Sequence, residues 1–353
     1  MNNMLEQNNL KLISDLKELI LQTKSQVAVQ VNAAMTLMYW QIGNKINSEI
    51  LQNQRAEYGK AIVKQVSQNL VEEFGSSFEE TNLRRMMQFA SVFDDFEIVV
   101  SLIRQLSWTH FQQLISISDD LKRQFYTEMC RLENWSVRTL IEKKKNLLYE
   151  RTAISKKPDE VIKQELDNLS SNDILTKDLV FRDPYFLDFL ELKDVFSEKD
   201  LEESIIVELQ KFISELGTDF AFLGRQKRII IDGVDYYIDL LFFHRRLKSL
   251  VVIDLKLGDF QATYKGQVEL YLSYLNKFER VEGENSPIGL ILCSGKNSEH
   301  IELMNLEKDN IKVAEYLLVL PKKEVLLDKL HRSIEIAKNK INSTTDSEFS
   351  ELE

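Results

Sequence analysis

The stretch YYIDLLFFHRRLKSLVVIDLKLG, residues 236–258, decides the fold of the C-terminal half of the chain. Two apolar runs flank the short basic segment RRLK, a pattern typical of two strands joined in a hairpin. Each run carries an acid where an apolar side chain would pack better, Asp239 in the first and Asp254 in the second. Lys256 follows Asp254 by two residues, so both side chains are expected on one face of their strand. A buried carboxylate without a partner is costly, and these two acids therefore need one.

Two interpretations of that partner are open. Lys256 could form a structural ion pair with Asp254 and, across the hairpin, with Asp239. Alternatively, two carboxylates on neighbouring strands could bind Mg²⁺, which prefers oxygen ligands and retains several waters. Such an ion neutralises phosphate charge and lowers the pKa of a bound water, and a lysine beside it could position that water or stabilise developing charge. The second interpretation predicts phosphodiester hydrolysis.

The chain from residue 181 onward alternates between strand and helix patterns. The strand patterns cover 220–231, 236–244, 249–257, 288–294 and 312–320, and the helix patterns cover 200–216, 260–278, 299–306 and 322–337. This order predicts an α+β protein whose second domain has a mixed sheet with helices on its faces.

Residues 10–151 carry apolar stripes at helical spacing almost throughout, which predicts a helical N-terminal domain. Arg84 and Arg85 stand early in the helix after Gly75, as in a helix-turn-helix that binds DNA. A plain helical bundle or a dimerisation domain is the simpler interpretation. The polar segment 152–180 is expected to be a linker and the acidic tail 338–353 to be disordered, which leaves 181–337 for the second domain.

Composition bounds the class of protein. The chain has 353 residues and a net charge of −11, so its overall charge does not by itself favour nucleic acid, although it leaves room for divalent cations. Cys130 and Cys293 form no CxxC pair, and the four histidines have no zinc spacing. The polar N-terminus does not resemble a signal peptide, and no apolar run reaches the roughly 18 residues that span a bilayer. We expect a cytoplasmic protein without a membrane segment.

Further polar residues surround the two acids in the predicted fold. Glu202 lies near the start of a helix, three, four and seven positions before Ile205, Ile206 and Leu209, and so shares their packing face; Glu208 is a second choice. Gln267 and Tyr271 lie four apart on the next helix and could contact DNA or support the metal ligands, although an ordinary amphipathic surface explains them equally well. A local basic strip precedes and follows Asp239, formed by Arg225, Gln226, Lys227 and Arg228 and by Arg245, Arg246 and Lys248. Such a strip suits phosphate contact, but any hairpin surface is also charged.

The motif IDLLFFHRRLKSLVVIDLKLGDF…YKGQVELYL resembles the PD-(D/E)xK nuclease superfamily, and more closely the YhcG-type nucleases, which carry a helical N-terminal domain of unknown function. Residues 200–229 and the segments YWQIG, LSWTH and WSVRTLI…LYER extend the resemblance to about residues 25–330. The resemblance implies a restriction-endonuclease-like fold, dependence on Mg²⁺ for which Mn²⁺ can substitute, and DNA cleavage in bacterial DNA processing or defence. It also implies the roles of six residues: Asp239 as the first acid, Asp254 and Lys256 as the (D/E)xK pair, Glu202 as the helix acid, and Gln267 with Tyr271 as the Q-x-x-x-Y element of one branch of the superfamily.

Two positions depart from the family pattern. The family usually has glutamate at the position of Asp254, and aspartate is one methylene shorter, a displacement that matters for catalytic placement. Ile238 also stands where the motif name has proline. Three functions therefore remain open: an Mg²⁺-dependent endodeoxyribonuclease, a catalytically silent scaffold for DNA or protein, and one subunit of a larger defence system. A homodimer or another partner bound through the N-terminal domain fits each of them, and DNA is favoured over RNA.

Overall fold

A computed structural model describes residues 2–52, 56–152, 159–172, 175–192, 195–217, 219–295, 301, 304 and 306–319. The chain divides into two compact units, Met1–Lys143 and Lys144–Glu353. The division falls before residue 151, the end that the sequence predicts for the helical domain. The predicted helix 322–337 and the tail 338–353 lie outside the described residues.

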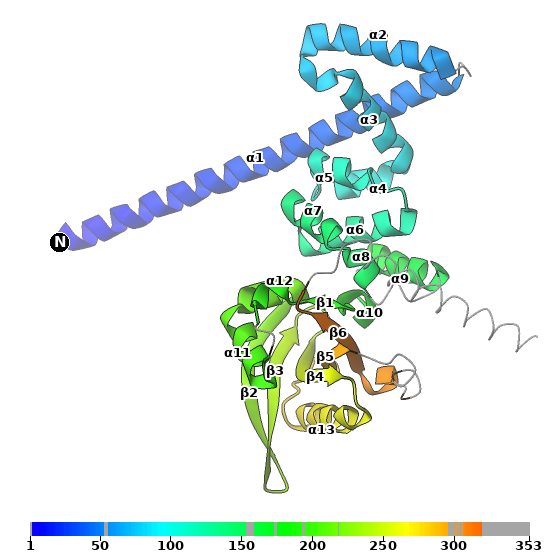
Figure 1. The fold of residues 1–353 in the computed structure, drawn as a ribbon. Coiled ribbons are helices and arrows are strands. Elements are labelled where there is room, and N and C mark those ends of the chain that lie inside the picture. The colour runs from blue at the N-terminus through cyan, green and yellow to red at the C-terminus, as the bar shows by residue number, and fades with distance from the viewer. Residues whose placement is uncertain are drawn as a thin grey trace, which may run out of the picture. The chain divides into compact units, whose positions relative to one another are not determined.

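The first unit is helical in its described part, as the sequence predicts (Figure 1). Its helices are α1 (Asn2–Gln52), α2 (Ala56–Phe74), α3 (Glu80–Val92), α4 (Phe96–Leu102), α5 (Trp108–Leu114), α6 (Asp120–Glu133) and α7 (Val137–Lys145), with a 3-10 turn η1 (Ser76–Phe78). The first helix, α1, is continuous over 51 residues. No helix in the described part of the chain is long and apolar enough to cross a membrane.

The core of the first unit forms where the C-terminal part of α1 packs against α2 and α3. Tyr39 and Ile46 of α1 are buried with Val63 of α2 and with Leu83 and Met86 of α3. Gly43 makes this close approach possible, because a Cβ atom at position 43 would lie 1.9 Å from the main-chain oxygen of Met86. The described part of α1 before Thr36 has no buried side chain.

The second unit contains a six-stranded mixed sheet in the order β1-β6-β5-β4-β3-β2, which confirms the predicted fold class. Its strands are β1 (Tyr185–Phe186), β2 (Phe220–Ile231), β3 (Val234–His244), β4 (Ser249–Asp259), β5 (Ile288–Gly295) and β6 (Ile311–Leu317). β2, β3 and β4 are antiparallel neighbours, whereas β4, β5, β6 and β1 are parallel. The strand β1 was not predicted, because a two-residue strand leaves no pattern in the sequence.

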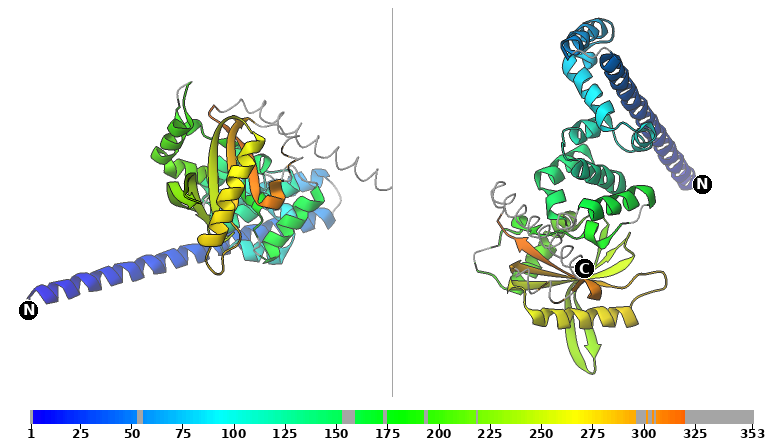
Figure 2. Two further views of the ribbon diagram at one scale, coloured as in Figure 1. Left: turned by 90° about the horizontal axis from the view of Figure 1, so that it is seen from below. Right: turned by 90° about the vertical axis from the view of Figure 1, so that its right-hand side faces the viewer.

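Helices cover both faces of this sheet (Figure 1 and Figure 2). One apolar core lies under α11 (Glu198–Val207) and α12 (Leu209–Leu216), and the other lies under α13 (Ala262–Phe278). The shorter helices are α8 (Leu148–Arg151), α9 (Asp159–Asn172) and α10 (Lys177–Val180), with 3-10 turns at Asp188–Leu190 and Leu306–Asp309. The predicted single helix 200–216 is wrong in one respect: it is interrupted at Glu208, whose φ and ψ of −100° and 28° are not helical.

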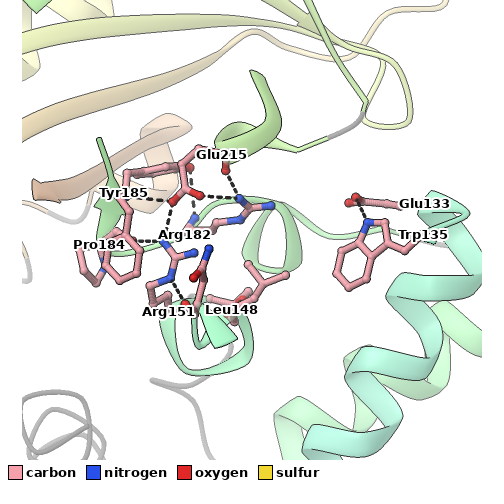
Figure 3. A network of polar contacts seen from close by, with 11 residues as sticks. Glu133, Trp135, Leu148, Arg151, Arg182, Pro184, Tyr185 and Glu215 are labelled. Carbon is pink, nitrogen blue, oxygen red and sulfur yellow. Dashed lines mark hydrogen bonds and ion pairs between the residues drawn. The ribbon is translucent and has the colours of Figure 1, made fainter. Parts of the chain in front are cut away.

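A buried ionic network ties the short helix α8 to α12 within the second unit (Figure 3). Arg151 is fully buried; its Nη1 donates to Glu215 Oε1 at 2.5 Å and to the main-chain oxygen of Pro184 at 3.1 Å. Arg182 also pairs with Glu215, and the guanidinium carbon of Arg151 lies 3.9 Å from the centre of the Phe186 ring. Residues just before the predicted linker are therefore part of the core of the sheet-containing unit.

Candidate active site

The two strand acids lie where β3 and β4 part. The antiparallel ladder between these strands runs from His244↔Ser249 to Leu240↔Ile253 and then stops, although both strands continue. Asp239 and Asp254 are the next residues on each strand. β3 goes on beside β2 as a two-stranded hairpin, while β4 stays beside β5 (Figure 1). The predicted hairpin thus brings both acids to the point where the ladder between β3 and β4 ends.

The carboxylate of Asp239 takes the place of the missing ladder partner. Its Oδ2 accepts a hydrogen bond of 2.9 Å from the main-chain N–H of Leu255. Leu255 lies between Asp254 and Lys256, so this bond holds the first acid against the (D/E)xK segment.

Lys256 and Asp254 point to the same side of β4, as the two-residue spacing predicts. Lys256 Nζ lies 3.0 Å from both carboxylate oxygens of Asp254. Both side chains are buried, with Asp254 1% exposed and Lys256 8% exposed. The ammonium group also lies 5.4 Å from the centre of the Tyr264 ring. Lys256 therefore meets Asp254 directly, whereas no direct contact between Lys256 and Asp239 is present in the described structure.

Glu202 of α11 reaches the same place from outside the sheet. It is buried, and its Oε2 accepts a hydrogen bond from Nε2 of Gln226, which also donates to Asp239 Oδ1 at 3.2 Å. Glu202 Oε1 lies 3.5 Å from Nε of Arg225. Glu208, the alternative helix acid, pairs instead with Lys211 at 2.9 Å and belongs to the break between α11 and α12.

Gln267 and Tyr271 form one connected pair on α13. Gln267 Nε2 donates to the hydroxyl oxygen of Tyr271 at 2.6 Å, and that hydroxyl donates to the main-chain oxygen of Tyr237 at 2.9 Å. Tyr237 lies two residues before Asp239 on β3. The pair therefore supports the strand that carries the first acid, and Tyr271 is buried rather than available to a ligand.

Four of the six cations of the predicted basic strip pair with acidic side chains in the structure. Arg225 meets Glu202, Lys227 Nζ lies 2.7 Å from Glu279, and Arg228 Nη2 lies 2.9 Å from Asp235. Beyond β3, Arg246 pairs with Asp219 at 2.8 Å. These four cations are therefore already held in ion pairs, and nucleic acid would have to compete with the acids for them.

Sequence reasoning missed Glu198, which stands one turn before Glu202 on α11. Its Oε1 accepts a hydrogen bond of 3.1 Å from the main-chain N–H of Leu257, the residue after Lys256. The spacing of four residues from Glu202 places both acids on one helix face and could have identified it. Tyr316 was also missed; its hydroxyl donates to the main-chain oxygen of Lys256 at 3.4 Å.

Burial controls the charge of the site. It raises the pKa of Asp254 to about 7, with Lys256 opposing the shift and Asp239 adding to it. Burial likewise raises the pKa of Asp239 and that of Glu202. Burial alone would lower the pKa of Lys256, but Asp254, Asp239 and Glu198 together outweigh burial and raise that pKa. The lysine is therefore charged at neutral pH. A cation bound among the three acids would favour their ionised form and so lower their pKa values.

The donor set suits a hard divalent cation. Asp254 Oδ2 is buried and accepts no hydrogen bond, although Lys256 Nζ lies close to it, so a coordination position is open there. The other candidate ligand atoms are carboxylate oxygens, which Mg²⁺ and Mn²⁺ accept. Among the residues that the structure describes, no three His, Cys, Asp or Glu side chains converge closely enough to hold a metal alone. Water and phosphate oxygens would complete the coordination shell, as is usual for Mg²⁺.

The parted strands thus bring together the two acids and the lysine of the (D/E)xK pattern, and comparison with known proteins shows the family to which the chain belongs. Residues 178–331 match the model of the YhcG PDDEXK nuclease domain, and residues 15–151 match that of the DUF1016 N-terminal domain. The chain belongs to the YhcG family of PDDEXK nucleases.

The chain is similar to one protein along most of its sequence and to several solved structures over about a third of its length. It is 34% identical over 347 residues to the “Putative nuclease YhcG” of Escherichia coli (strain K12), covering 89% of this chain and 92% of that protein. Among solved structures it is similar to a repair endonuclease from Pyrococcus abyssi, with 19% identity, a TM-score of 0.25 and coverage of 36% of this chain and 50% of that one. It is also similar to EndoMS in a complex with double-stranded DNA, with 19% identity, a TM-score of 0.27 and coverage of 37% and 49%.

Proposed function

We propose that the chain is a divalent-metal-dependent endodeoxyribonuclease acting in bacterial DNA processing or defence. The observation that carries this proposal is the meeting of Asp239, Asp254 and Lys256 at the point where β3 and β4 part. Family membership supports the nuclease class, and the proposal adds the metal, the DNA substrate and the residues.

Asp239 and Asp254, with Glu202 beside them, would hold Mg²⁺ or, in its place, Mn²⁺. Such an ion neutralises phosphate charge and lowers the pKa of a bound water. Lys256 places its charge beside Asp254, where it would position the attacking water and stabilise the charge that develops on the phosphate oxygens. For this arrangement to form, Asp254 must lose its proton, and its carboxylate must bind the metal ion beside Lys256. Activity is therefore expected to depend on pH.

Other residues hold the site in shape or contact the substrate. Tyr271, supported by Gln267, holds the β3 backbone at Tyr237. The cations of the basic strip contact DNA phosphates, four of them by exchanging their present acidic partners for the phosphates, and these contacts are expected to weaken at high salt. The expected location of the protein is the cytoplasm.

The nuclease proposal is tested with supercoiled plasmid and linear duplex in the presence of Mg²⁺, Mn²⁺ or EDTA. Metal-dependent nicking by the wild type that is lost in Asp254→Ala would support it. Single-stranded DNA and RNA of the same sequence serve as competing substrates, and plasmid circles separate endonucleolytic from exonucleolytic action. Absence of cleavage across metals and substrates would favour the silent scaffold, which would still bind DNA in EDTA.

The partner part of the proposal rests on α1. Large apolar side chains are exposed along the part of α1 before Thr36: Ile13, Leu16, Leu19, Ile20, Leu21, Val27, Val29, Val31 and Met35. Ile13, Leu16, Ile20, Val27 and Val31 follow helical spacing and so share one face, as in helices that pair with another helix. A second copy of the chain is the partner we favour. Light scattering should show a mass that falls to that of the monomer in Ile20→Glu, and a monomeric wild type would point to a different partner.

A further inference from the structure

At Gln226 of β2 and Asp239 of β3, the side chains of each strand change from one face of the sheet to the other. Residues two apart on a strand normally share a face. Leu240, however, belongs to the core under α11 and α12, whereas Ile238 belongs to the core under α13. The same change occurs on β2, where Arg225 approaches Glu202 of α11 and Lys227 pairs with Glu279 at the end of α13. The residues between them, Gln226 and Asp239, therefore lie at the crossover of the two strands.

Gln226 has an unusual backbone conformation at this crossover. Its φ is +46°, the left-handed region, in a strand residue that is neither glycine nor part of a turn. The cross-strand pairs on either side, Arg225↔Leu240 and Lys227↔Ile238, keep one register, so the strand is inverted here without an inserted residue. Left-handed conformations of residues with a β-carbon cost energy, and they persist where the surrounding structure imposes them.

The inversion delivers the Gln226 side chain to the candidate site. Its amide nitrogen donates to Glu202 Oε2 and, at 3.2 Å, to Asp239 Oδ1. One amide group thus joins the helix acid to the strand acid. Glu202 is the only one of the three proposed ligands that comes from outside the sheet, and β2 supplies both side chains that contact its carboxylate in the described structure.

We propose that Gln226 is a positioning residue, whose inverted backbone places its amide between Glu202 and Asp239 and so brings the helix acid into the metal site. This inference rests on the proposed metal-dependent function, but its first test needs no metal. Two variants separate the amide from the backbone. Gln226→Gly removes the amide and suits a positive φ, whereas Gln226→Asn keeps an amide on a residue that tolerates the left-handed region.

The first experiment is a double-mutant cycle for Gln226→Gly and Glu202→Ala, measured by urea unfolding of the full chain in EDTA. All three tryptophans, at positions 40, 108 and 135, lie in the first unit, so tryptophan fluorescence reports on that unit and far-UV circular dichroism reports on both. Gln226→Gly is expected to raise the urea midpoint of the second unit more in the Glu202→Ala background than in the wild type, because only the wild type loses the amide contact to Glu202. Ile230→Gly, on the exposed part of the same strand, should be additive with Glu202→Ala. Additive midpoint shifts for Gln226→Gly would overturn the proposal.

The second experiment measures Mn²⁺ binding by calorimetry. Gln226→Gly should weaken binding by about 10- to 100-fold, as expected when a residue that orients a ligand is removed, and Gln226→Asn should recover part of the loss. Unchanged binding by a stable Gln226→Gly variant would also overturn the proposal. A wild type that binds no Mn²⁺ would count against the metal-dependent function instead, and the cycle in EDTA would still decide whether Gln226 positions Glu202.

Discussion

The carboxylate of Asp239 accepts a hydrogen bond of 2.9 Å from the main-chain N–H of Leu255, at the point where the β3–β4 ladder ends. The Asp239 carboxylate thereby accepts the hydrogen bond that a main-chain oxygen of β3 would accept if the ladder with β4 continued. This bond explains how the sheet can open at the candidate site without leaving the Leu255 amide unsatisfied. It also gives Asp239 a structural role beside the proposed chemical one.

The two roles of Asp239 can be separated by substitution. Asp239→Asn keeps an oxygen that accepts from Leu255 and removes a charge that burial disfavours, but it loses the bond from the Gln226 amide, so its free energy of unfolding should stay close to that of the wild type. Asp239→Ala leaves the amide unpaired and should be less stable than Asp239→Asn by about 1–3 kcal/mol. Both variants should lose DNA cleavage. Urea unfolding and plasmid nicking measure the two effects, and cleavage by Asp239→Asn at the wild-type rate would contradict the role as a ligand.

Replacing Lys256 should abolish cleavage and leave the fold intact. Without the ammonium group, Asp254 can remain buried by holding a proton, because burial already raises its pKa to about 7. Lys256→Ala is therefore expected to fold normally at pH 6 and to be less stable at pH 8, where the unpaired acid is driven to ionise. Circular dichroism and nicking assays at both pH values test this. Retained cleavage by Lys256→Ala would remove the lysine from the mechanism.

Asp254 should make stability fall as pH rises. Its folded-state pKa of about 7 lies above the ordinary value of 3.8, so the folded chain binds more protons than the unfolded chain between these values. The stabilising contribution is present in full below about pH 4 and is lost as pH rises to about 7, with an upper limit on the order of 4 kcal/mol. Asp254→Asn cannot titrate and should lack this dependence. The difference between the two pH profiles of urea unfolding is the measurement, and identical profiles would contradict the raised pKa.

Metal binding should have the opposite pH dependence, because the ion must displace the Asp254 proton. With a pKa of about 7, the apparent affinity for Mn²⁺ should be about tenfold weaker at pH 6 than at pH 8. Calorimetry in buffers of different ionisation enthalpy should detect proton release at pH 6 and little at pH 8. An affinity independent of pH in this range would show that Asp254 is not a ligand.

The buried network around Arg151 should stabilise the second unit alone. Glu215→Gln leaves the buried Arg151 without its charged partner and should cost about 3–5 kcal/mol. Arg151→Met combined with Glu215→Gln should cost less than Glu215→Gln alone, because Arg182 is then the one arginine of this network without its charged partner, whereas Glu215→Gln alone leaves both Arg151 and Arg182 without theirs. Far-UV circular dichroism should show the loss in the second unit, while tryptophan fluorescence of the first unit stays unchanged. A shift of equal size in both units would contradict this assignment.

Local patterns in the sequence were sufficient for much of the sheet and the paired acids. The run 220–231 predicts β2 with its observed ends. Gly217 precedes this run and the Asp232–Gly233 turn follows it, so the sequence marks both ends of the strand. The two-residue spacing of Asp254 and Lys256 predicts their contact, since a strand has a period of two. The helix spacing of Glu202 correctly predicts that it is buried toward the sheet. The resemblance in residues 236–258 also identified the family.

Tertiary structure alone decided how these pieces meet. Gln226 breaks the period of two through a left-handed backbone, and no pattern in its neighbours reveals this, because the contacts that maintain it come from α11 and β3. Asp239 bonds to Leu255 only because β3 leaves β4 at that residue, and Arg151 finds Glu215 across 64 positions of the chain. Periodicity follows from local backbone geometry and can be read along a sequence. Partners for buried charges depend on packing between distant segments, and the folded chain alone brings those segments together.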